Sequence, residues 1–408
     1  MSFPNYKHPF ELMINPSATP AVPYGAAQSE VLNADGLKSA KEVICAWPGY
    51  AATPLVELPG IVRAAGVASI LYKDEGQRFG LKSFKPLGGA YAVARLLMRT
   101  IIAGTVDRAI SVHDLLDGKY RDICAGITVT AATDGNHGRS VAWGARMFGC
   151  RCVIFINEAV SERRENAIAD LGATVRRNPG SYDDAVRTAQ HTASDEGWFV
   201  IPDTSDGHII EAPRDVTQGY ALMAAEVIEQ LPYDEPPTHI FLQAGVGGMA
   251  AATCAQFWQS FGADRPMTIL VEPVSSACWF ESLKEKEPVA IRGDLDSLMG
   301  GLSCGEVSRL AWIILKPGAD AAIKLPDEAA ADAMRLLAAG KCGDAPLVGG
   351  ESGVAGLAAF LAVAGDEDAR QKLALSSSSR IVLFGTEGAT DPQTYADIVG
   401  RSPEEITA

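Results

Sequence analysis

The sequence predicts an α/β protein with two open domains, each built on a mostly parallel, twisted sheet. Short β-branched segments alternate with segments of helical length from residue 127 to residue 203, and the alternation returns from residue 238 to residue 388. Such alternation is typical of βαβ units, whose strands run parallel. The proline-rich stretch 231–237 separates the two series. We therefore expect a large domain from residues 1–89 with 230–408, and a small domain from residues 90–229.

Composition excludes several classes of protein. The chain has 408 residues, of which 47% are hydrophobic and 21% charged, as in a globular protein with a large core. The net charge of −15 argues against nucleic acid or an anionic membrane as a partner, because both need a basic face. The charge does not identify a substrate, and acidity of this kind is usually a solubility property.

The cysteines and the N-terminus indicate a cytoplasmic enzyme. The eight cysteines form no C-x-x-C pair, which disfavours zinc ribbons and thioredoxin-like redox sites. The first ten residues lack a basic segment followed by an apolar one, so we expect no signal peptide. No apolar run reaches the roughly 18 residues of a membrane span.

Local patterns predict the individual elements in chain order. Residues 1–35 show little periodicity and predict a surface strap, whereas residues 36–66 predict a helix, a turn and an extended segment. Residues 105–125 are polar and predict an insertion. Strands are predicted at 68–75, 127–132, 151–156, 173–180, 198–203, 238–243, 267–273 and 380–385. Helices are predicted at 90–104, 139–149, 160–173, 181–197, 248–258, 326–340 and 352–365.

The stretch 82–92 contains the lysine around which we expect the site to form. Lys85 follows Ser83 and Phe84, and a glycine pair with a small-residue helix start comes after it. A partly buried lysine can form an imine with a carbonyl cofactor, and a flat apolar neighbour can pack on the cofactor ring. A surface lysine at a helix N-terminus is the alternative that this stretch alone leaves open.

Four unusual loops follow strands, around Asp134, Asp203, Gly245 and Thr386. In open α/β sheets ligands bind at the carboxyl ends of the strands, so we expect these loops to form one site with Lys85. Taken singly, each loop has a structural explanation. Asp134 suits a helix N-cap and Asp203 an Asx-turn, while Thr386 suits an ordinary turn.

The glycine loop 244–249 joins a strand to a helix, so its backbone amides and the helix N-terminus suit a phosphate. The segment also matches G-x-G-x-x-A, and Glu272 ends the next strand. That pattern is similar to a dinucleotide fingerprint. A nicotinamide-binding oxidoreductase and a purely structural turn are therefore alternatives.

Together these segments resemble the tryptophan-synthase-β-like, fold-type II family of pyridoxal-phosphate enzymes, and within it the diaminopropionate ammonia-lyases. The resemblance runs from about residue 50 to residue 390 and rests on segments in the same order. These are RFGLKSFKPLGGAYA, TDGNHGR, PDT, QAGVGGM, GLSCGE, GGESG and TEG. The sequence differs from the threonine and serine dehydratases at two places. Those enzymes usually have a serine at the position of Asp134, and an arginine after the lysine where this chain has Pro86-Leu87.

The resemblance implies a site in the cleft between the domains, with pyridoxal 5'-phosphate bound to Lys85. It implies that Phe84 packs on the ring, that Asn136 bonds the ring hydroxyl and that Thr386 faces the pyridine nitrogen. Asp134 and Asp203 would be bases for the two substrate enantiomers. The implied phosphate contacts are Gly245, Val246, Gly247, Gly248 and Met249, and the implied substrate contacts are Ser83, Thr133, Asp134, Gly135 and His137. No metal is implied. Cys278 and Cys304 fall in similar segments, and we expect them to be unpaired core thiols.

The predicted function is α,β-elimination of D- or L-2,3-diaminopropionate to pyruvate and ammonia through aminoacrylate. An acid in the pocket would attract the second amino group of this substrate. The alternatives are a lyase of another β-substituted alanine (serine, threonine or an N-substituted diaminopropionate), a nicotinamide-binding oxidoreductase and a cofactor-binding protein without catalysis. We expect a homodimer.

Overall fold

The computed structural model describes residues 6–407 except residues 108, 134, 181, 233–235 and 341–342, and the side chain of residue 183. Its chain divides into two compact units. Unit 1 comprises residues 1–31, 52–83 and 223–408, and unit 2 comprises residues 32–51 and 84–222. Compared with the predicted domains, residues 32–51 and 84–89 are grouped with the smaller unit, and residues 223–229 with the larger one.

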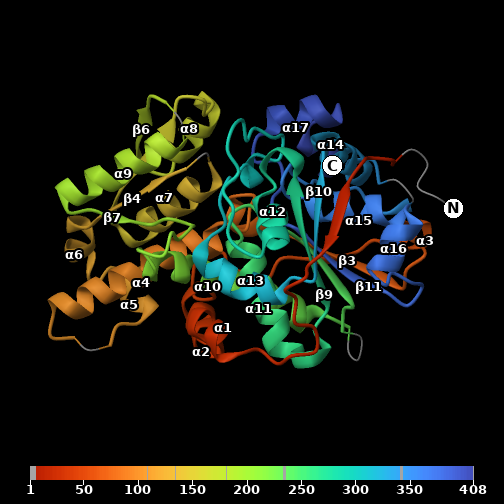
Figure 1. The fold of residues 1–408 in the computed structure, drawn as a ribbon. Helices are drawn as coiled ribbons and strands as arrows, with labels where there is room; N and C mark the ends of the chain where they lie inside the picture. Colours follow the sequence, from red (N-terminus) through yellow and green to blue (C-terminus); the bar gives the residue numbers. More distant parts are fainter. Residues whose placement is uncertain are drawn as a thin grey trace. The chain divides into compact units, whose positions relative to one another are not determined.

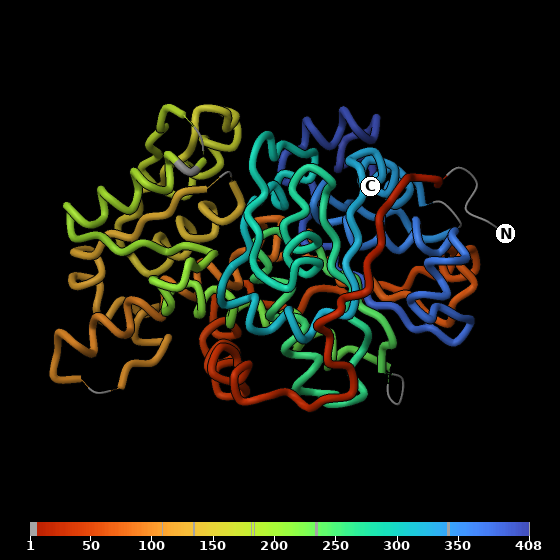
Figure 2. The backbone as a smooth tube through the Cα atoms, viewed as in Figure 1, coloured from red at the N-terminus to blue at the C-terminus, as the bar shows by residue number. Residues whose placement is uncertain are grey.

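Unit 1 is built on a seven-stranded sheet whose inner strands run parallel and whose edge strands run antiparallel. Its order is β1 (Glu11–Ile14), β10 (Ala321–Leu325), β9 (Met267–Pro273), β8 (His239–Gln243), β11 (Arg380–Gly385), β3 (Ser69–Asp74) and β2 (Leu55–Glu57). The N-terminal segment lies beside β10 although the two are some 300 residues apart (Figure 2). The predicted surface strap therefore includes an edge strand.

Helices cover both faces of this sheet (Figure 1). Alternate strand residues such as Phe241 and Leu383 pack on α14 (Asp327–Ala338) and α15 (Ala355–Ala364). The opposite face lies against α11 (Gly248–Phe261) and α12 (Cys278–Glu285), as in the contact of Phe384 with Phe257. The remaining helices of unit 1 are α1 (Ala26–Val31), α3 (Pro59–Ala65), α13 (Arg309–Gly318), α16 (Glu367–Lys372), α17 (Pro392–Val399) and α18 (Pro403–Thr407). Short 3-10 turns lie at Glu75–Gly80, Gly262–Asp264, Val274–Ser276 and Gly300–Leu302.

Unit 2 is built on a four-stranded parallel sheet in the order β6 (Thr174–Asn178), β5 (Arg151–Asn157), β4 (Thr128–Ala132) and β7 (Phe199–Val200). Its helices are α2 (Ala34–Ile44), α4 (Pro86–Gly104), α5 (Val112–Leu116), α6 (Arg121–Gly126), α7 (Asn136–Phe148), α8 (Glu162–Ala169) and α9 (Tyr182–Glu196). Helix α10 (Glu211–Gln230) begins in unit 2, and its residues from Met223 onward are grouped with unit 1.

The α/β class and the parallel sheets are confirmed. Several elements differ from the sequence-based expectation, among them α4, α5, α6 and α10. The predicted helix at 90–104 begins earlier, at Pro86, since proline suits the first helical position. The predicted insertion at 105–125 contains α5 and most of α6, and residues 211–230, to which no element was assigned, form α10. No helix in the described part of the chain is long and apolar enough to span a membrane.

A buried network of four charged side chains fixes the chain between β3 and α4. Lys73 Nζ lies 2.8 Å from Glu226 Oε2, and Arg78 Nη2 lies 2.7 Å from both Glu75 Oε1 and Glu226 Oε2. Each side chain is at most 1% exposed. Although burial alone would raise it, Arg78 and Lys73 hold the pKa of Glu226 below its usual value. The network therefore balances two positive and two negative charges away from water.

The same network holds a strained segment. Phe79 and Lys82 have φ angles of +51° and +59°, which non-glycine residues adopt only at a cost. Phe79 directly follows Arg78, and Lys82 directly precedes Ser83. We infer that the ion pairs of Arg78 compensate for this strain.

We predict that Glu226→Gln lowers the free energy of unfolding by about 3–5 kcal/mol, because it leaves one buried positive charge unbalanced. Chemical denaturation of the purified protein measures the change. Glu328→Gln, at an exposed position of α14 in the same unit, is the control, for which we expect a change within about 0.5 kcal/mol. Equal stability of the two variants would contradict this account.

Candidate active site

The residues predicted to form the site fall into two groups. Unit 2 contains Phe84, Lys85, Thr133, Gly135, Asn136, His137 and Asp203, and unit 1 contains Ser83, Gly245, Val246, Gly247, Gly248, Met249 and Thr386. Asp134 lies outside the described residues.

Lys85 lies at the N-cap of α4 with its ammonium against an acid and two aromatic rings. Its Nζ donates a hydrogen bond of 2.7 Å to Asp203 Oδ2, and the two side chains are 19% and 17% exposed. The same nitrogen lies 5.5 Å from the ring centroid of Phe84 and 5.9 Å from that of Tyr220. The lysine is therefore partly buried, as a covalent attachment point for a carbonyl compound requires.

Close packing around the first turn of α4 explains why this lysine is held in place. A Cβ at Gly88 would collide with the ring of Tyr220 on α10, and a Cβ at Gly89 would collide with Ser140 on α7. The paired glycines therefore let two helices approach the turn that follows Lys85.

Asp203 lies in the loop after β7 and is held in its ionised form. Burial alone would raise its pKa, but the ammonium of Lys85 holds the pKa of Asp203 well below its usual range. His137 Nδ1 lies 4.0 Å from Asp203 Oδ2. The acid is therefore a carboxylate at neutral pH.

His137 presents an acceptor atom toward this acid. Its Nε2 lies 2.7 Å from the carbonyl oxygen of Ile201, which can only accept, so Nε2 carries the hydrogen. Burial lowers the pKa of His137. The neutral ring leaves Nδ1 as a lone-pair acceptor, and this buried atom has no hydrogen-bond partner among the described residues.

The side chain of Thr133 bonds to the backbone around the start of α7. The hydroxyl of Thr133 accepts hydrogen bonds from the N–H groups of Gly135 and Gly138, at 3.0 and 3.2 Å. Asn136 begins α7, where its Oδ1 accepts from Arg139. The roles predicted for Thr133, Gly135 and Asn136 stay predictions.

The glycine loop after β8 offers a set of unpaired backbone donors. Gly245 and Gly247 have φ angles of +51° and +99°, which turn the chain sharply into α11. Within the described part of the chain, no acceptor pairs with the backbone N–H groups of Gly245, Val246, Gly248 and Met249. Donors at the start of a helix suit an anion with several oxygens.

Trp279 forms a wall behind this loop and is held by Glu272. Its indole Nε1 donates to the carbonyl oxygen of Gly245 at 3.0 Å, and a Cβ at Gly247 would collide with the indole. The carboxylate of Glu272 accepts from the N–H groups of Trp279 and Phe280 at 2.9 and 2.8 Å. Glu272, which resembled the acid of a dinucleotide fingerprint, is 1% exposed and holds α12 instead. The nicotinamide alternative loses that support.

We predict that Glu272 makes stability fall as pH rises through neutrality. Burial raises the pKa of Glu272 to about 7, although Trp279 and Phe280 donate to the carboxylate. In the unfolded chain a glutamate has a pKa near 4.3, and a carboxyl group whose pKa is higher in the folded protein stabilises the fold at pH values below 4.3. This stabilisation is lost as the pH rises through the pKa of the folded protein. Between pH 5 and 8, the wild type should lose about 3 kcal/mol relative to Glu272→Gln.

Denaturant unfolding of both proteins across this pH range measures the effect. Glu285→Gln is the control, because Glu285 is an exposed residue at the end of the same helix. Parallel pH curves for the wild type and Glu272→Gln would contradict the prediction.

Thr386 follows β11 and lies in a buried turn of unit 1. Its hydroxyl accepts a hydrogen bond of 2.8 Å from Nε2 of Gln243, at the end of β8. Ser83, which is 2% exposed, pairs with Glu387 in this turn. A Cβ at Gly385 would collide with the ring of Tyr72, which explains the glycine before Thr386.

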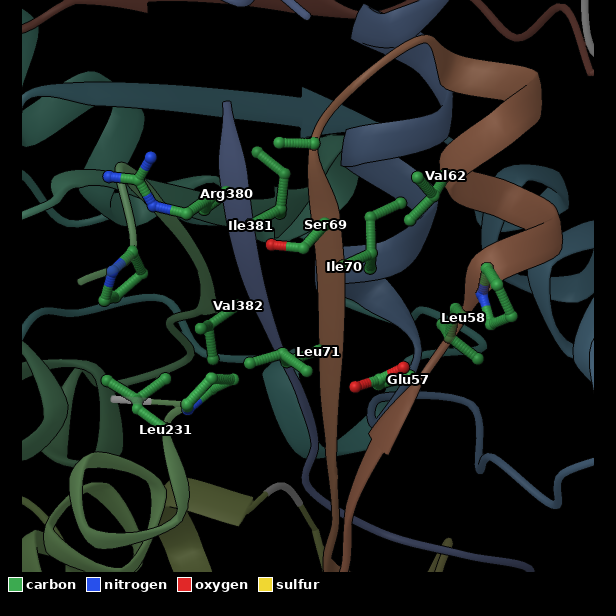
Figure 3. A pocket seen from close by; sticks show the side chains of 14 residues that line it. Glu57, Leu58, Val62, Ser69, Ile70, Leu71, Leu231, Arg380, Ile381 and Val382 are labelled. Carbon is green, nitrogen blue, oxygen red and sulfur yellow. The ribbon is translucent and has the colours of Figure 1, made fainter. Parts of the chain in front are cut away.

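A separate pocket lies at the amino ends of β3 and β11 (Figure 3). It has a volume of about 210 Å³ and is lined by residues that include Ser69 and Arg380, the first residues of β3 and β11. The glycine loop and Thr386 instead follow the carboxyl ends of β8 and β11. The pocket is therefore distinct from the candidate site.

The structure adds residues that the sequence analysis did not assign to the site. Tyr220 packs on Phe84 with a ring-centroid distance of 4.7 Å, Trp279 supports the glycine loop, and Gln243 contacts Thr386. None of the three lies in a loop of small polar residues, which was the signal used to find the site. The sequence signal that could have assigned Gln243 to the site is its position directly before the glycine loop.

The fold and these residues define the chain as a member of a known class. The family model for pyridoxal-phosphate-dependent enzymes matches residues 46–387, and the chain belongs to this family. Diaminopropionate ammonia-lyase of Salmonella typhimurium is 37% identical over 368 residues, which cover 87% of this chain and 90% of that protein. The Escherichia coli enzyme of the same name is 36% identical over 362 residues, covering 88% and 89%.

Solved structures give the same result. A holo structure of the Escherichia coli diaminopropionate ammonia-lyase matches with a TM-score of 0.87 and 32% identity, covering 96% of this chain and 97% of that chain. Another structure of that enzyme contains an aminoacrylate–pyridoxal-phosphate azomethine reaction intermediate and matches with a TM-score of 0.85. Within its family, the chain therefore belongs with the diaminopropionate ammonia-lyases. The fold-type II class is confirmed. A tomato threonine deaminase at 19% identity shares the fold, with a TM-score of 0.70.

Proposed function

We propose that this protein uses pyridoxal 5'-phosphate to eliminate ammonia from 2,3-diaminopropionate, giving aminoacrylate that hydrolyses to pyruvate and a second ammonia. The observation that carries the proposal is the 2.7 Å contact between the Lys85 ammonium and the ionised Asp203 carboxylate. The relatives named above support the substrate, because they carry the same name at 36–37% identity.

The described residues fit this cofactor. Lys85 would bond its aldehyde carbon, and Phe84 would pack against its ring. The N–H groups of the glycine loop would hold its phosphate, which needs several donors and no basic side chain. Asn136 would bond the ring hydroxyl. When bound, the cofactor supplies an aldehyde that bonds covalently to amines and a ring that accepts the electron pair of a broken C–H bond.

The charge balance around Asp203 favours a substrate with two amino groups. While Lys85 is bonded to the cofactor, its nitrogen would no longer meet Asp203 as a free ammonium. A second cation beside this partly buried carboxylate would then be favourable. The β-ammonium of diaminopropionate supplies that cation, whereas the hydroxyl of serine does not.

Two acceptors in unit 2 would act on the substrate. Asp203, held ionised, would attract the β-ammonium or take the Cα proton, while Nδ1 of neutral His137 would accept a hydrogen bond from an amino group. Asp134 would supply the second base. With bases on opposite faces of the substrate, both enantiomers would react. Ser83, Thr133 and Gly135 would contact the substrate.

A second candidate substrate class is the β-hydroxy amino acids. The Escherichia coli relative has been crystallised with D-serine, in a structure that matches this chain with a TM-score of 0.85. Serine would bind the same site, but it would leave Asp203 without a cationic partner. A cytoplasmic location and a homodimer are further proposals that rest on the sequence.

We predict that the purified protein is yellow, and that borohydride bleaches it and fixes the cofactor to Lys85. Only an amine bonded to the cofactor aldehyde is trapped in this way. Peptide mass spectrometry locates the label, and coupled assays measure pyruvate and ammonia released from D- and L-diaminopropionate and from D- and L-serine. We expect diaminopropionate to be preferred.

Lys85→Ala should show no trapped label, whereas Lys82→Ala, three residues earlier, should retain it. A colourless protein that binds nicotinamide nucleotides would rule out the proposed function. A yellow protein that prefers serine would support the proposed cofactor and contradict the proposed substrate.

We predict that Asp203→Asn and Asp134→Asn each impair one enantiomer more than the other, with kcat/KM falling at least about 100-fold for the affected one. A positioned base typically contributes 10²–10⁴-fold. Steady-state kinetics with each enantiomer give the comparison. Asp206→Asn, in the exposed part of the Asp203 loop, is the control. If both variants lose activity toward both enantiomers equally, the assignment of one base to each enantiomer is wrong.

A further inference from the structure

The side-chain amide of Gln243 is placed to control the direction of the Thr386 hydroxyl. Gln243 is 3% exposed and Thr386 is 2% exposed. Nε2 of Gln243 lies 2.8 Å from Thr386 Oγ1, 2.8 Å from the carbonyl oxygen of Phe384 and 3.2 Å from that of Gly353. Both residues are in unit 1, at the carboxyl ends of the neighbouring strands β8 and β11.

The orientation of the amide follows from its neighbours. Two carbonyl oxygens can only accept hydrogen bonds, so the group that faces them must be the NH₂ and not the amide oxygen. An amide nitrogen does not accept, so Thr386 Oγ1 must accept from it. The two amide hydrogens then serve the two 2.8 Å contacts.

This arrangement leaves one donor without a partner. A threonine hydroxyl has one hydrogen and can rotate to suit its acceptors. Because Thr386 Oγ1 accepts from Gln243, its hydrogen must point away from Gln243, and among the described residues no acceptor receives it. Buried donors are rarely left unpaired, so a bound molecule is expected to supply the acceptor.

We propose that Gln243 is a positioning residue that fixes Thr386 as a hydrogen-bond donor to the pyridine nitrogen of the cofactor. The proposal rests on the proposed function, in which Thr386 faces that nitrogen. Thr386 can donate only to an unprotonated nitrogen, so Gln243 also favours the neutral ring. Without Gln243, the carbonyl oxygen of Phe384 loses its donor, and the Thr386 hydroxyl can turn to that carbonyl instead.

The test uses Gln243→Met, which keeps the side-chain length and removes the amide. Gln243→Glu replaces the donor with an acceptor of the same shape and would draw the Thr386 hydrogen toward itself. The holoenzymes are loaded with pyridoxal phosphate labelled with ¹⁵N in the ring, and the nitrogen chemical shift reports its hydrogen bond. The comparison set is Thr386→Val, Thr386→Ser and the double variant Gln243→Met with Thr386→Val.

We expect both Gln243 variants to shift the nitrogen signal in the same direction as Thr386→Val, while Thr386→Ser resembles the wild type. The value of kcat should fall about tenfold with little change in KM, as for the loss of one hydrogen bond in the transition state. The double variant should be no worse than Thr386→Val alone, because both changes remove the same interaction. Gln259→Met, on α11, is the matched control, because its amide bonds only within its own helix.

Several outcomes would overturn the proposal. These are an unchanged nitrogen signal in the Gln243 variants, losses that add in the double variant, or a nitrogen signal unaffected by Thr386→Val. Variants that unfold or lose the cofactor altogether would assign Gln243 to holding the strands together, and would overturn it as well. A colourless wild type contradicts the proposed function, whereas a yellow, active wild type with unaltered Gln243 variants contradicts only this inference.

Discussion

The buried ion pairs of Arg78 are the constraint on which the path of the chain to Lys85 depends. They join the end of β3 to the part of α10 that belongs to unit 1, through Glu75 and Glu226. After Arg78 the chain passes through three left-handed residues, Phe79, Gly80 and Lys82, before reaching Ser83, which pairs with Glu387 beside Thr386. Lys85 follows two residues later. An apolar cluster could fill the same volume, but it would not give the guanidinium's directed hydrogen bonds to two elements far apart in sequence.

The sequence predicts the fold where buried strands alternate with amphipathic helices, because burial of one face gives the hydrophobic residues a regular spacing that is visible in the sequence. It misses elements whose stability comes from contacts elsewhere. Strand β1 has four residues and β2 has three, and each depends on pairing with one inner strand. Helix α10 contains Pro213 near its start and Gly219 in its interior, which weaken a helical pattern. The structure explains Gly219, since a Cβ there would collide with the carbonyl of Leu87. Tertiary packing therefore outweighs the low helix propensity.

The candidate site shows the same division between local and long-range information. Lys85, the glycine loop and Thr386 could be predicted as site residues because each interrupts a regular element with residues suited to an anion, an amine or a turn. Asp203 was predicted as well, but the hydrogen bonds that join these residues to their partners could not be predicted. The hydrogen bond between Lys85 and Asp203 joins residues 118 positions apart, and that between Gln243 and Thr386 joins residues 143 apart. Glu272 illustrates the reverse case, because a local motif suggested a nucleotide contact and the folded chain uses the acid to hold α12.

With the residue roles proposed above, two features of the described residues would favour elimination over other fates of a substrate carbanion. A hydroxyl donor at Thr386 is compatible with a neutral pyridine ring, which withdraws electrons less strongly than a protonated one. An electron pair that the ring holds weakly is more readily used to expel a leaving group. In the proposed function, the carboxylate of Asp203 would favour a leaving group that arrives as a cation, because this partly buried charge loses the Lys85 ammonium when Lys85 is bonded to the cofactor. The hydroxyl of Thr386 in unit 1 would thus influence the type of reaction, and Asp203 in unit 2 would influence the choice of substrate. A change at Gln243 should therefore alter the rate for every substrate alike, while a change at Asp203 should alter the choice among them.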